Sequence, residues 1–144
     1  MHLETQRFGN IEVANEQLLL FPGGLIGMER LRQWAMIPDA QNDSLAWLQS
    51  TSNGRIALPV ISPRLYFPDY RVRISPRGLE SLRIRPGQAT YILTTVSEHG
   101  DQITTNLHAP LVINVHERLG AQIVTTDTQP LRQRISLSLQ RAAA

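Results

Sequence analysis

Four short runs decide the fold: ATYILTTV at residues 89–96, ITTNL at 103–107, LVINV at 111–115 and QIVTT at 122–126. Most positions in each run are apolar or β-branched, and each run has the length of a strand. Strands that are apolar on both faces are typical of a sheet that is covered on both sides or closed on itself. We therefore expect these runs to form the centre of such a sheet.

Outside these runs, apolar and polar residues alternate, which is typical of strands with one face in water. Tyr70, Val72 and Ile74 alternate with arginines, and the same period of two recurs at 82–85 and 135–139. Further strands are predicted at 3–8, 11–13, 17–21, 33–37, 46–49 and 55–61.

Turn residues separate the predicted strands. Asn53-Gly54 predicts a tight hairpin, and we also expect turns at His99-Gly100-Asp101 and at Leu119-Gly120. Pro59 lies inside a predicted strand, which indicates an edge or a bulge because proline lacks the N–H that a ladder needs. Short helical turns are possible only at 27–32 and 76–82, since no window has a sustained helical period.

About a dozen short, evenly spaced strands predict an all-β fold, a small antiparallel β-barrel-like single domain with one or two short helical turns. The chain of 144 residues has the length of one domain. We assign residues 1–140 to the barrel and 141–144 to a flexible tail.

Composition excludes several classes of protein. With 42% hydrophobic and 18% charged residues, the chain is neither disordered nor a membrane protein, and no apolar run approaches the roughly 20 residues of a membrane-spanning helix. The first residues lack the basic and apolar segments of a signal peptide, so we expect a cytoplasmic protein. The absence of cysteine excludes disulfides and thiolate chemistry.

No motif in the sequence predicts catalysis, a metal or a cofactor. His108 and His116 flank one predicted strand and lie too far apart to share a metal, and no paired acids or GxSxG nucleophile motif is present. The Gly-rich segment at 23–27 lacks the Lys-Ser/Thr of a phosphate loop. We interpret it as a turn that lets two backbones approach closely.

One basic segment suggests binding to nucleic acid. Tyr66, Phe67 and Tyr70 lie among six arginines, and small barrels hold single strands through such basic faces with stacking aromatics. The alternative interpretation is a solvated face whose aromatics belong to the core. The six arginines are Arg64, Arg71, Arg73, Arg77, Arg83 and Arg85.

Four blocks occur together in order: FPGGLIG at 21–27, LAWLQS at 45–50, TNLHAPLVIN at 105–114 and GAQ at 120–122. With these blocks the chain resembles the family of the flagellar assembly factor FliW over about residues 3–135. The resemblance implies a small cytoplasmic β-barrel without catalysis. It also implies two partners: the RNA-binding translational regulator CsrA and flagellin. By exchanging these partners, such a factor relieves CsrA repression of flagellin synthesis.

Candidate protein-binding residues are taken from the matching blocks, and each of them also has a plausible structural role. They are Trp47, Gln49, Asn106, His108 and Pro110. Two other functions stay open beside protein binding: a nucleic-acid-binding barrel that uses residues 64–85, and an enzyme or ligand carrier with a barrel pocket.

Overall fold

The computed structural model describes residues 1–137, and in this part of the chain most of the regular structure is strand. The strands are β1 (His2–Thr5), β2 (Gly9–Glu12), β3 (Leu18–Leu20), β4 (Gln33–Pro38), β5 (Leu45–Ser50), β6 (Ala57–Ile61), β7 (Thr90–His99), β8 (Gln102–Thr105), β9 (Leu111–Asn114), β10 (Leu119–Gln122) and β11 (Gln133–Ile135). Short 3₁₀ helices are η1 (Asn15–Gln17), η2 (Pro63–Leu65) and η3 (Pro76–Leu82).

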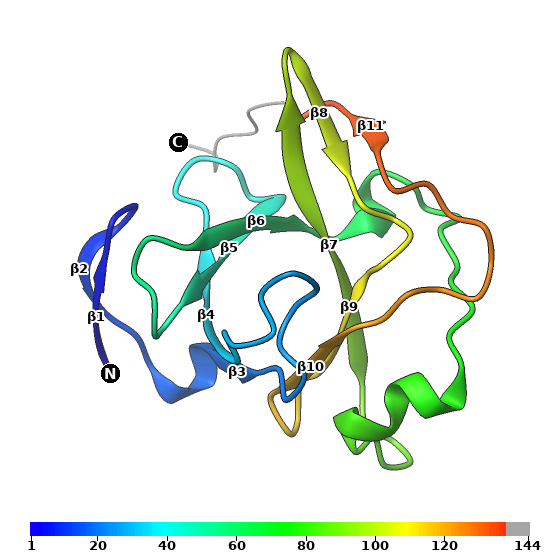
Figure 1. Cartoon of the computed structure of the whole chain (residues 1–144), viewed down its shortest axis with the longest axis horizontal. Coiled ribbons are helices and arrows are strands. Elements are labelled where there is room, and N and C mark those ends of the chain that lie inside the picture. The colour runs from blue at the N-terminus through cyan, green and yellow to red at the C-terminus, as the bar shows by residue number, and fades with distance from the viewer. Residues whose placement is uncertain (138–144) are drawn as a thin grey trace.

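Within the described residues, seven strands close into a barrel in the order β7-β6-β5-β4-β3-β10-β9, with β9 pairing back onto β7 (Figure 1). The expected all-β, barrel-like fold is thereby confirmed. One pairing departs from the expected antiparallel pattern, because β10 runs parallel to β3 at Leu119 and Leu20. A backbone hydrogen bond of 3.0 Å from the N–H of Leu20 to the carbonyl of Arg118 supports this contact.

The barrel interior is filled by alternate side chains of its strands and by the segment between β3 and β4. Trp34 and Leu48 are fully buried there, together with Phe21 and Leu25 of the inserted segment. The predicted close turn at 23–27 is confirmed, since Gly24 has a φ of +67° and a Cβ at this position would lie 2.5 Å from the backbone of Glu29. This packing fixes the barrel as a rigid body.

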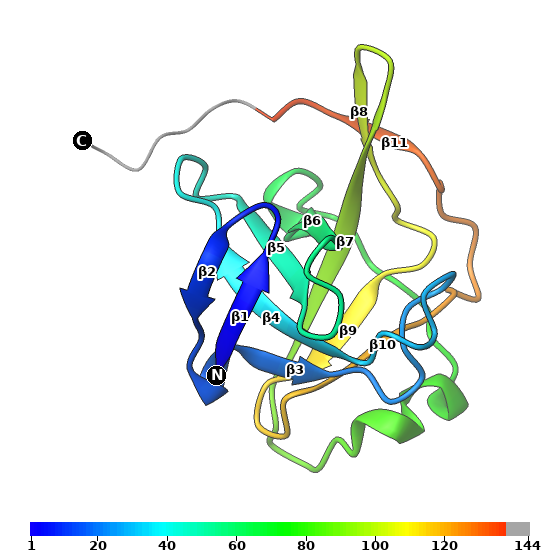
Figure 2. The same ribbon diagram turned by 60° about the vertical axis from the view of Figure 1, so that its left-hand side comes forward.

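The β1–β2 hairpin packs against the outside of the barrel wall (Figure 2). Leu3 and Val13 form a small apolar cluster with Ala35 of β4. The N–H of Gln6 donates to the carbonyl of Gly54 over 2.9 Å, which joins the hairpin to the turn between β5 and β6. These contacts place the β1–β2 turn directly beside the β5–β6 turn.

Two predicted strands are wrong. Residues 71–75 are extended but form no ladder, and 82–85 lie at the end of η3 and in the turn after it. The alternation holds at 70–74, where Tyr70 is buried and Ile74 packs with Ile123 while Arg71 and Arg73 face solvent. It fails at 82–85, because Leu82 is buried but Ile84 is exposed. Backbone partners come from single bonds, such as the N–H of Thr126 to the carbonyl of Arg73 at 2.7 Å, instead of a neighbouring strand.

Other local predictions have mixed outcomes. The helical turn at 76–82 is confirmed as η3, whereas 27–32 forms turns without a helix. Leu119-Gly120 lies inside β10 and not in a turn, because the chain already reverses at 115–118, where Arg118 has a φ of 52°. The run predicted at 122–126 is strand only at Gln122.

The hairpins expected at Asn53-Gly54 and at His99-Gly100-Asp101 are present as β5–β6 and β7–β8. The first is not the tight turn expected, because residues 51–56 connect the two strands and neither Asn53 nor Gly54 has a positive φ. Pro59 pairs with Trp47 of β5 on one side. On its other side, β6 pairs with β7 only at Val60 and Ile61, so Pro59 has no partner in β7. The proline therefore occupies a locally unpaired edge, as its missing N–H requires.

The division into a domain at 1–140 and a tail at 141–144 stays a prediction, and residues 138–144 lie outside the described residues. Of the strand predicted at 135–139, Ile135 belongs to β11, residues 136–137 are not strand, and 138–139 lie outside the described residues. None of the helices in the described part of the chain has the length and apolar character needed to cross a membrane.

We predict that Gly54→Ala destabilises the protein. A Cβ at Gly54 would lie 2.2 Å from the carbonyl oxygen of Glu4, so the β1–β2 hairpin would have to move away from the barrel. Overpacking of this kind costs about 1–3 kcal/mol in the free energy of unfolding, measured by urea denaturation. The matched control is Gly23→Ala, where a Cβ meets no atom within 4 Å. Equal stability of the two variants would contradict the proposed docking of the hairpin.

Candidate functional site

Trp47 lies half-buried on the outer face of the barrel wall, in contact with the β1–β2 turn. Its indole N–H donates to Oδ1 of Asp39 over 2.9 Å. The guanidinium carbon of Arg7 lies 3.9 Å from the ring centroid, and Phe8 makes an edge contact with ring centroids 6.2 Å apart. Trp47 therefore joins three segments of the chain and keeps part of its ring accessible.

Asp39 is held in its ionised form at this position. The hydrogen bond from Trp47 is the main cause that lowers the pKa of the Asp39 carboxyl. Desolvation opposes it, and the backbone N–H groups of Gln41 and Asn42 lower the pKa further. The positive charge of Arg7 acts in the same direction. A fixed carboxylate thus orients the indole ring on which Arg7 stacks.

Gln49 is fully buried and pairs with Ala35, in the part of the barrel wall that the β1–β2 hairpin covers. Its Nε2 donates to the carbonyls of Ser50 and Ile56, at 3.0 and 3.1 Å, and more weakly to that of Gly54 at 3.4 Å. Its Oε1 is buried without a partner in the described residues. These contacts fix the β5–β6 turn, so the observed role of Gln49 is to shape the surface from below.

The other three predicted residues lie in the connection between β8 and β9. Oδ1 of Asn106 accepts the backbone N–H groups of His108 and Ala109, each at 3.0 Å, which fixes the loop as an Asx turn. Pro110 is buried, and its carbonyl accepts the N–H of Ile123. The half-buried side chain of His108 stays in reach of a partner.

The five predicted residues therefore form two groups and not one patch. Trp47 and Gln49 lie on β5 next to the β1–β2 hairpin, whereas the β8–β9 connection lies on the far side of the barrel in both views (Figures 1 and 2). Trp47 is partly exposed in the first group, and Asn106 and His108 are partly exposed in the second. The structure thus offers two separate surfaces.

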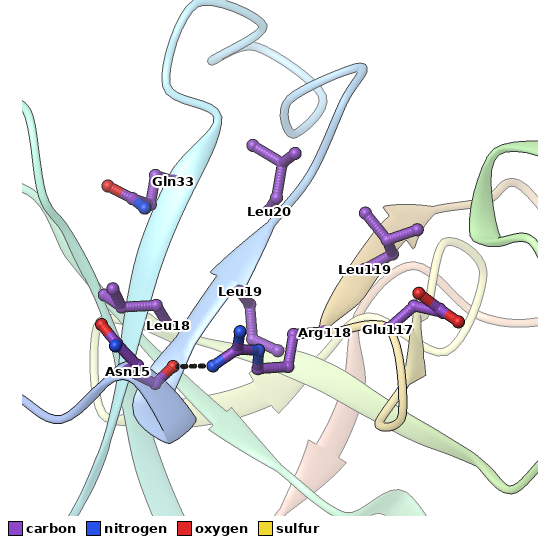
Figure 3. A pocket seen from close by; sticks show the side chains of 8 residues that line it. All are labelled: Asn15, Leu18, Leu19, Leu20, Gln33, Glu117, Arg118 and Leu119. Atoms are coloured by element: carbon purple, nitrogen blue, oxygen red, sulfur yellow. Dashed lines mark hydrogen bonds between the residues drawn. The ribbon is translucent and has the colours of Figure 1, made fainter.

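A hollow at one end of the barrel was missed in the sequence (Figure 3). It has a volume of about 390 Å³ and lies between β3, β4 and the β9–β10 turn. Nη1 of Arg118 reaches across it to the carbonyl of Asn15 over 2.6 Å, and Leu20 is 44% exposed beside it. The lining residues are Asn15, Leu18, Leu19, Leu20, Gln33, Glu117, Arg118 and Leu119.

A more apolar groove of about 280 Å³ continues from this hollow through Leu19 and Arg118. Met36, Leu93 and Ile113 form its floor, at the edge of the core. The sequence did contain a signal for this apolar groove. In the three consecutive leucines at 18–20, neighbouring side chains point to opposite faces of a strand, so apolar side chains must lie on both faces of β3. The groove joins strands that only the closed barrel brings together.

The basic segment is exposed, but its aromatics are not arranged as a stacking platform. All six arginines of the segment face solvent, and among residues 1–137 no arginine forms an ion pair with a carboxylate. Tyr70 is buried and donates its hydroxyl to the carbonyl of Leu107 over 2.7 Å, while the Tyr66 hydroxyl lies 2.7 Å from that of Ser44. Tyr70 thus serves the core.

In the part of the chain that the structure describes, no group of three or more histidine or acidic side chains is placed to hold a metal ion. The expectation that the protein uses no metal or cofactor stays a prediction. Fold and site together define a class of protein: a small closed β-barrel with three surface features. These are the outer face around Trp47, the hollow beside Arg118 and the β8–β9 loop fixed by Asn106.

Comparisons with known proteins agree with this class. The family model described as FliW protein matches residues 2–135. A flagellar assembly factor FliW of Bdellovibrio bacteriovorus is 33% identical, over 98% of this chain and 82% of that protein. One of Anoxybacillus flavithermus is 36% identical, over 89% of both chains. A crystal structure of the flagellar assembly factor FliW superposes with a TM-score of 0.85 at 30% identity, covering 93% of this chain and 96% of that one. The chain belongs to the FliW family of flagellar assembly factors.

We predict that Tyr70 ionises later than an ordinary tyrosine. Burial, and secondarily the charge of Asp127, raises the pKa of Tyr70 from 10.0 to about 12. Its contribution to stability is therefore complete below pH 10 and is lost as the pH rises toward 12. Ultraviolet absorbance titration should show a late phenolate step that disappears in Tyr70→Phe. A titration of Tyr70→Phe identical to that of the unmodified protein would contradict this assignment.

Proposed function

We propose that this chain binds the translational regulator CsrA and flagellin, and that it relieves CsrA repression of flagellin synthesis by exchanging these partners in the cytoplasm. Membership of the FliW family carries the proposal. In this function the chain acts by binding and not by catalysis. Free flagellin occupies the protein, and export of flagellin releases it to bind CsrA.

The barrel suits this function for a physical reason. Its wall is closed by hydrogen bonds around the ring and its interior is filled, so the partner surfaces exist before binding. A preorganised surface loses little conformational entropy on association, which leaves more of the contact free energy as affinity. Of the predicted site residues, Trp47, Asn106 and His108 are partly exposed, and the Asn106 side-chain oxygen is already used in its Asx turn. Trp47 and His108 are therefore the side chains that we expect a partner to contact on the two surfaces.

We predict that the purified chain co-elutes with the CsrA of the same bacterium on a sizing column at micromolar concentration, and that flagellin displaces CsrA from it. Trp47→Ala or His108→Ala should weaken at least one of the two complexes about tenfold, as truncation of an interface hot spot does. The matched control is Gln102→Ala, an exposed position on β8. Separate elution of all three proteins would contradict the proposed function.

Nucleic-acid binding through residues 64–85 stays a second candidate because of one observation. The six arginines of the segment are exposed and carry no ion pair in the described residues, while the segment contains only Asp69 and Glu80 as acids. Since Tyr70 is buried, such binding would depend on phosphate contacts more than on stacking.

For this second candidate we predict retention of single-stranded RNA that falls steeply with salt, with a slope of about −0.7 for each phosphate neutralised. Arg71→Glu combined with Arg73→Glu should abolish the retention and leave the circular dichroism spectrum unchanged. Absence of RNA retention at low salt would exclude this function.

A further inference from the structure

A polar hollow on the outer wall of the barrel has no assigned role. It has a volume of about 400 Å³ and is lined by Gln6, Arg7, Arg55 and Ala57. We propose that this hollow binds an acidic peptide segment of a protein partner, with the two guanidinium groups pairing its carboxylates. The inference rests on the proposed function, under which the chain acts by binding proteins, and it adds the chemistry that one surface recognises.

The two arginines come from turns that the fold holds together. Arg7 follows β1 and Arg55 precedes β6, and the two turns lie side by side on the left of the barrel (Figure 1). The N–H of Gln6 donates to the carbonyl of Gly54, and the N–H of Arg55 donates to Oδ1 of Asn53 over 3.1 Å. The spacing of the arginines is therefore set by backbone contacts.

Arg7 is also oriented before any ligand arrives. Its guanidinium lies 3.9 Å from the centroid of the Trp47 ring, and that ring is fixed by its hydrogen bond to Asp39. Stacking covers a face of the guanidinium and leaves its N–H groups, which lie in the plane, free to donate. A positioned fork of donors loses less entropy when it pairs with a carboxylate.

The two arginines of the hollow have no ion-pair partner in the described part of the protein. In the described residues neither Arg7 nor Arg55 forms an ion pair or a side-chain hydrogen bond. Asp39 acts on Arg7 through its charge, but its oxygens already accept from Trp47, Gln41 and Asn42. The donors of both guanidinium groups are thus available to a ligand that brings its own negative charge.

The lining favours carboxylates on a peptide over a free phosphate ion. Phosphate sites commonly use several free backbone N–H groups at a helix N-terminus or nest. Here the N–H groups of Gln6 and Arg55 are already bonded, so no row of free backbone N–H groups lines the hollow, and most of its donors belong to the two guanidinium groups. Beside them, the half-buried rings of Phe8 and Trp47 offer apolar contact to the rest of a peptide.

The test uses the full chain and a fluorescein-labelled glutamate hexamer, with anisotropy as the readout. Arg7→Gln combined with Arg55→Gln should weaken binding at least tenfold, because each charge-assisted pair that is lost removes about that factor. The matched control is Arg71→Gln combined with Arg73→Gln, which removes the same charge from another exposed surface. If removal of the Arg7 guanidinium from Trp47 disturbs folding, the single variant Arg55→Gln is used for the test. The Arg55 side chain forms no hydrogen bond, ion pair or ring contact in the described residues.

Loss of peptide binding in the Arg7/Arg55 variant but not in the control supports the proposal. No binding by the unmodified chain, equal loss in both variants, competition by inorganic phosphate as strong as by unlabelled peptide, or competition by RNA alone overturns it. The result distinguishes this inference from the proposed function. If neither CsrA nor flagellin co-elutes with the chain but the peptide binds, the proposed function fails and the acidic-peptide site is supported. If both proteins co-elute and the peptide does not bind, only the inference fails.

Discussion

The structure depends on β7, because this one strand pairs with three others along its length. Residues 90–93 pair with β9, residues 94–95 with β6, and residues 96–99 with β8. The first two pairings close the barrel, and the third starts the β7–β8 hairpin that projects from it (Figure 1). Thr94 is fully buried at the junction, and its hydroxyl accepts a hydrogen bond of 2.7 Å from Thr105 of β8. A buried hydroxyl pair that satisfies itself allows the strand to change partners without leaving a polar group unpaired.

The run at 89–96 was predictable because both faces of β7 are covered for part of its length, and this gives an apolar run without alternation. The segment 70–85 shows the limit of the same argument. Its alternation at 70–74 reflects side chains that turn inward at every second position, but the period of two does not show whether a neighbouring backbone lies beside it. At 82–85 the period is misleading, since Ile84 is exposed. Ile74 packs on Ile123 from an irregular segment and Leu82 from the end of η3, as both would from a strand. Only the positions of the other segments decide whether a ladder forms.

The candidate site was predictable in part for a similar reason. Trp47 and Asn106 could be chosen from blocks of sequence, and both prove to organise their surroundings, one through a ring stacked on Arg7 and the other through an Asx turn. Arg7 and Arg55 could not be chosen, because they lie far apart in the chain and come together through the docked hairpin and its hydrogen bond from Gln6 to Gly54. A surface formed by two turns carries no local pattern, and its residues are typical of any exposed loop.

The position of the β1–β2 hairpin connects the fold to binding. Its apolar side, Leu3 and Val13, packs on Ala35 and covers the wall, so that Gln49 is buried beneath it. Its turn then places Arg7 over Trp47 at the border of the covered area. The same packing that removes the wall from water therefore creates, at its edge, a surface with a fixed ring, a fixed carboxylate and two cations. The oxygens of Asp39 accept from three N–H donors, whereas the side chains of Arg7 and Arg55 have no ion-pair partner in the part of the chain that the structure describes. The hairpin edge thus combines one hydrogen-bonded carboxylate with two cations whose donors remain open.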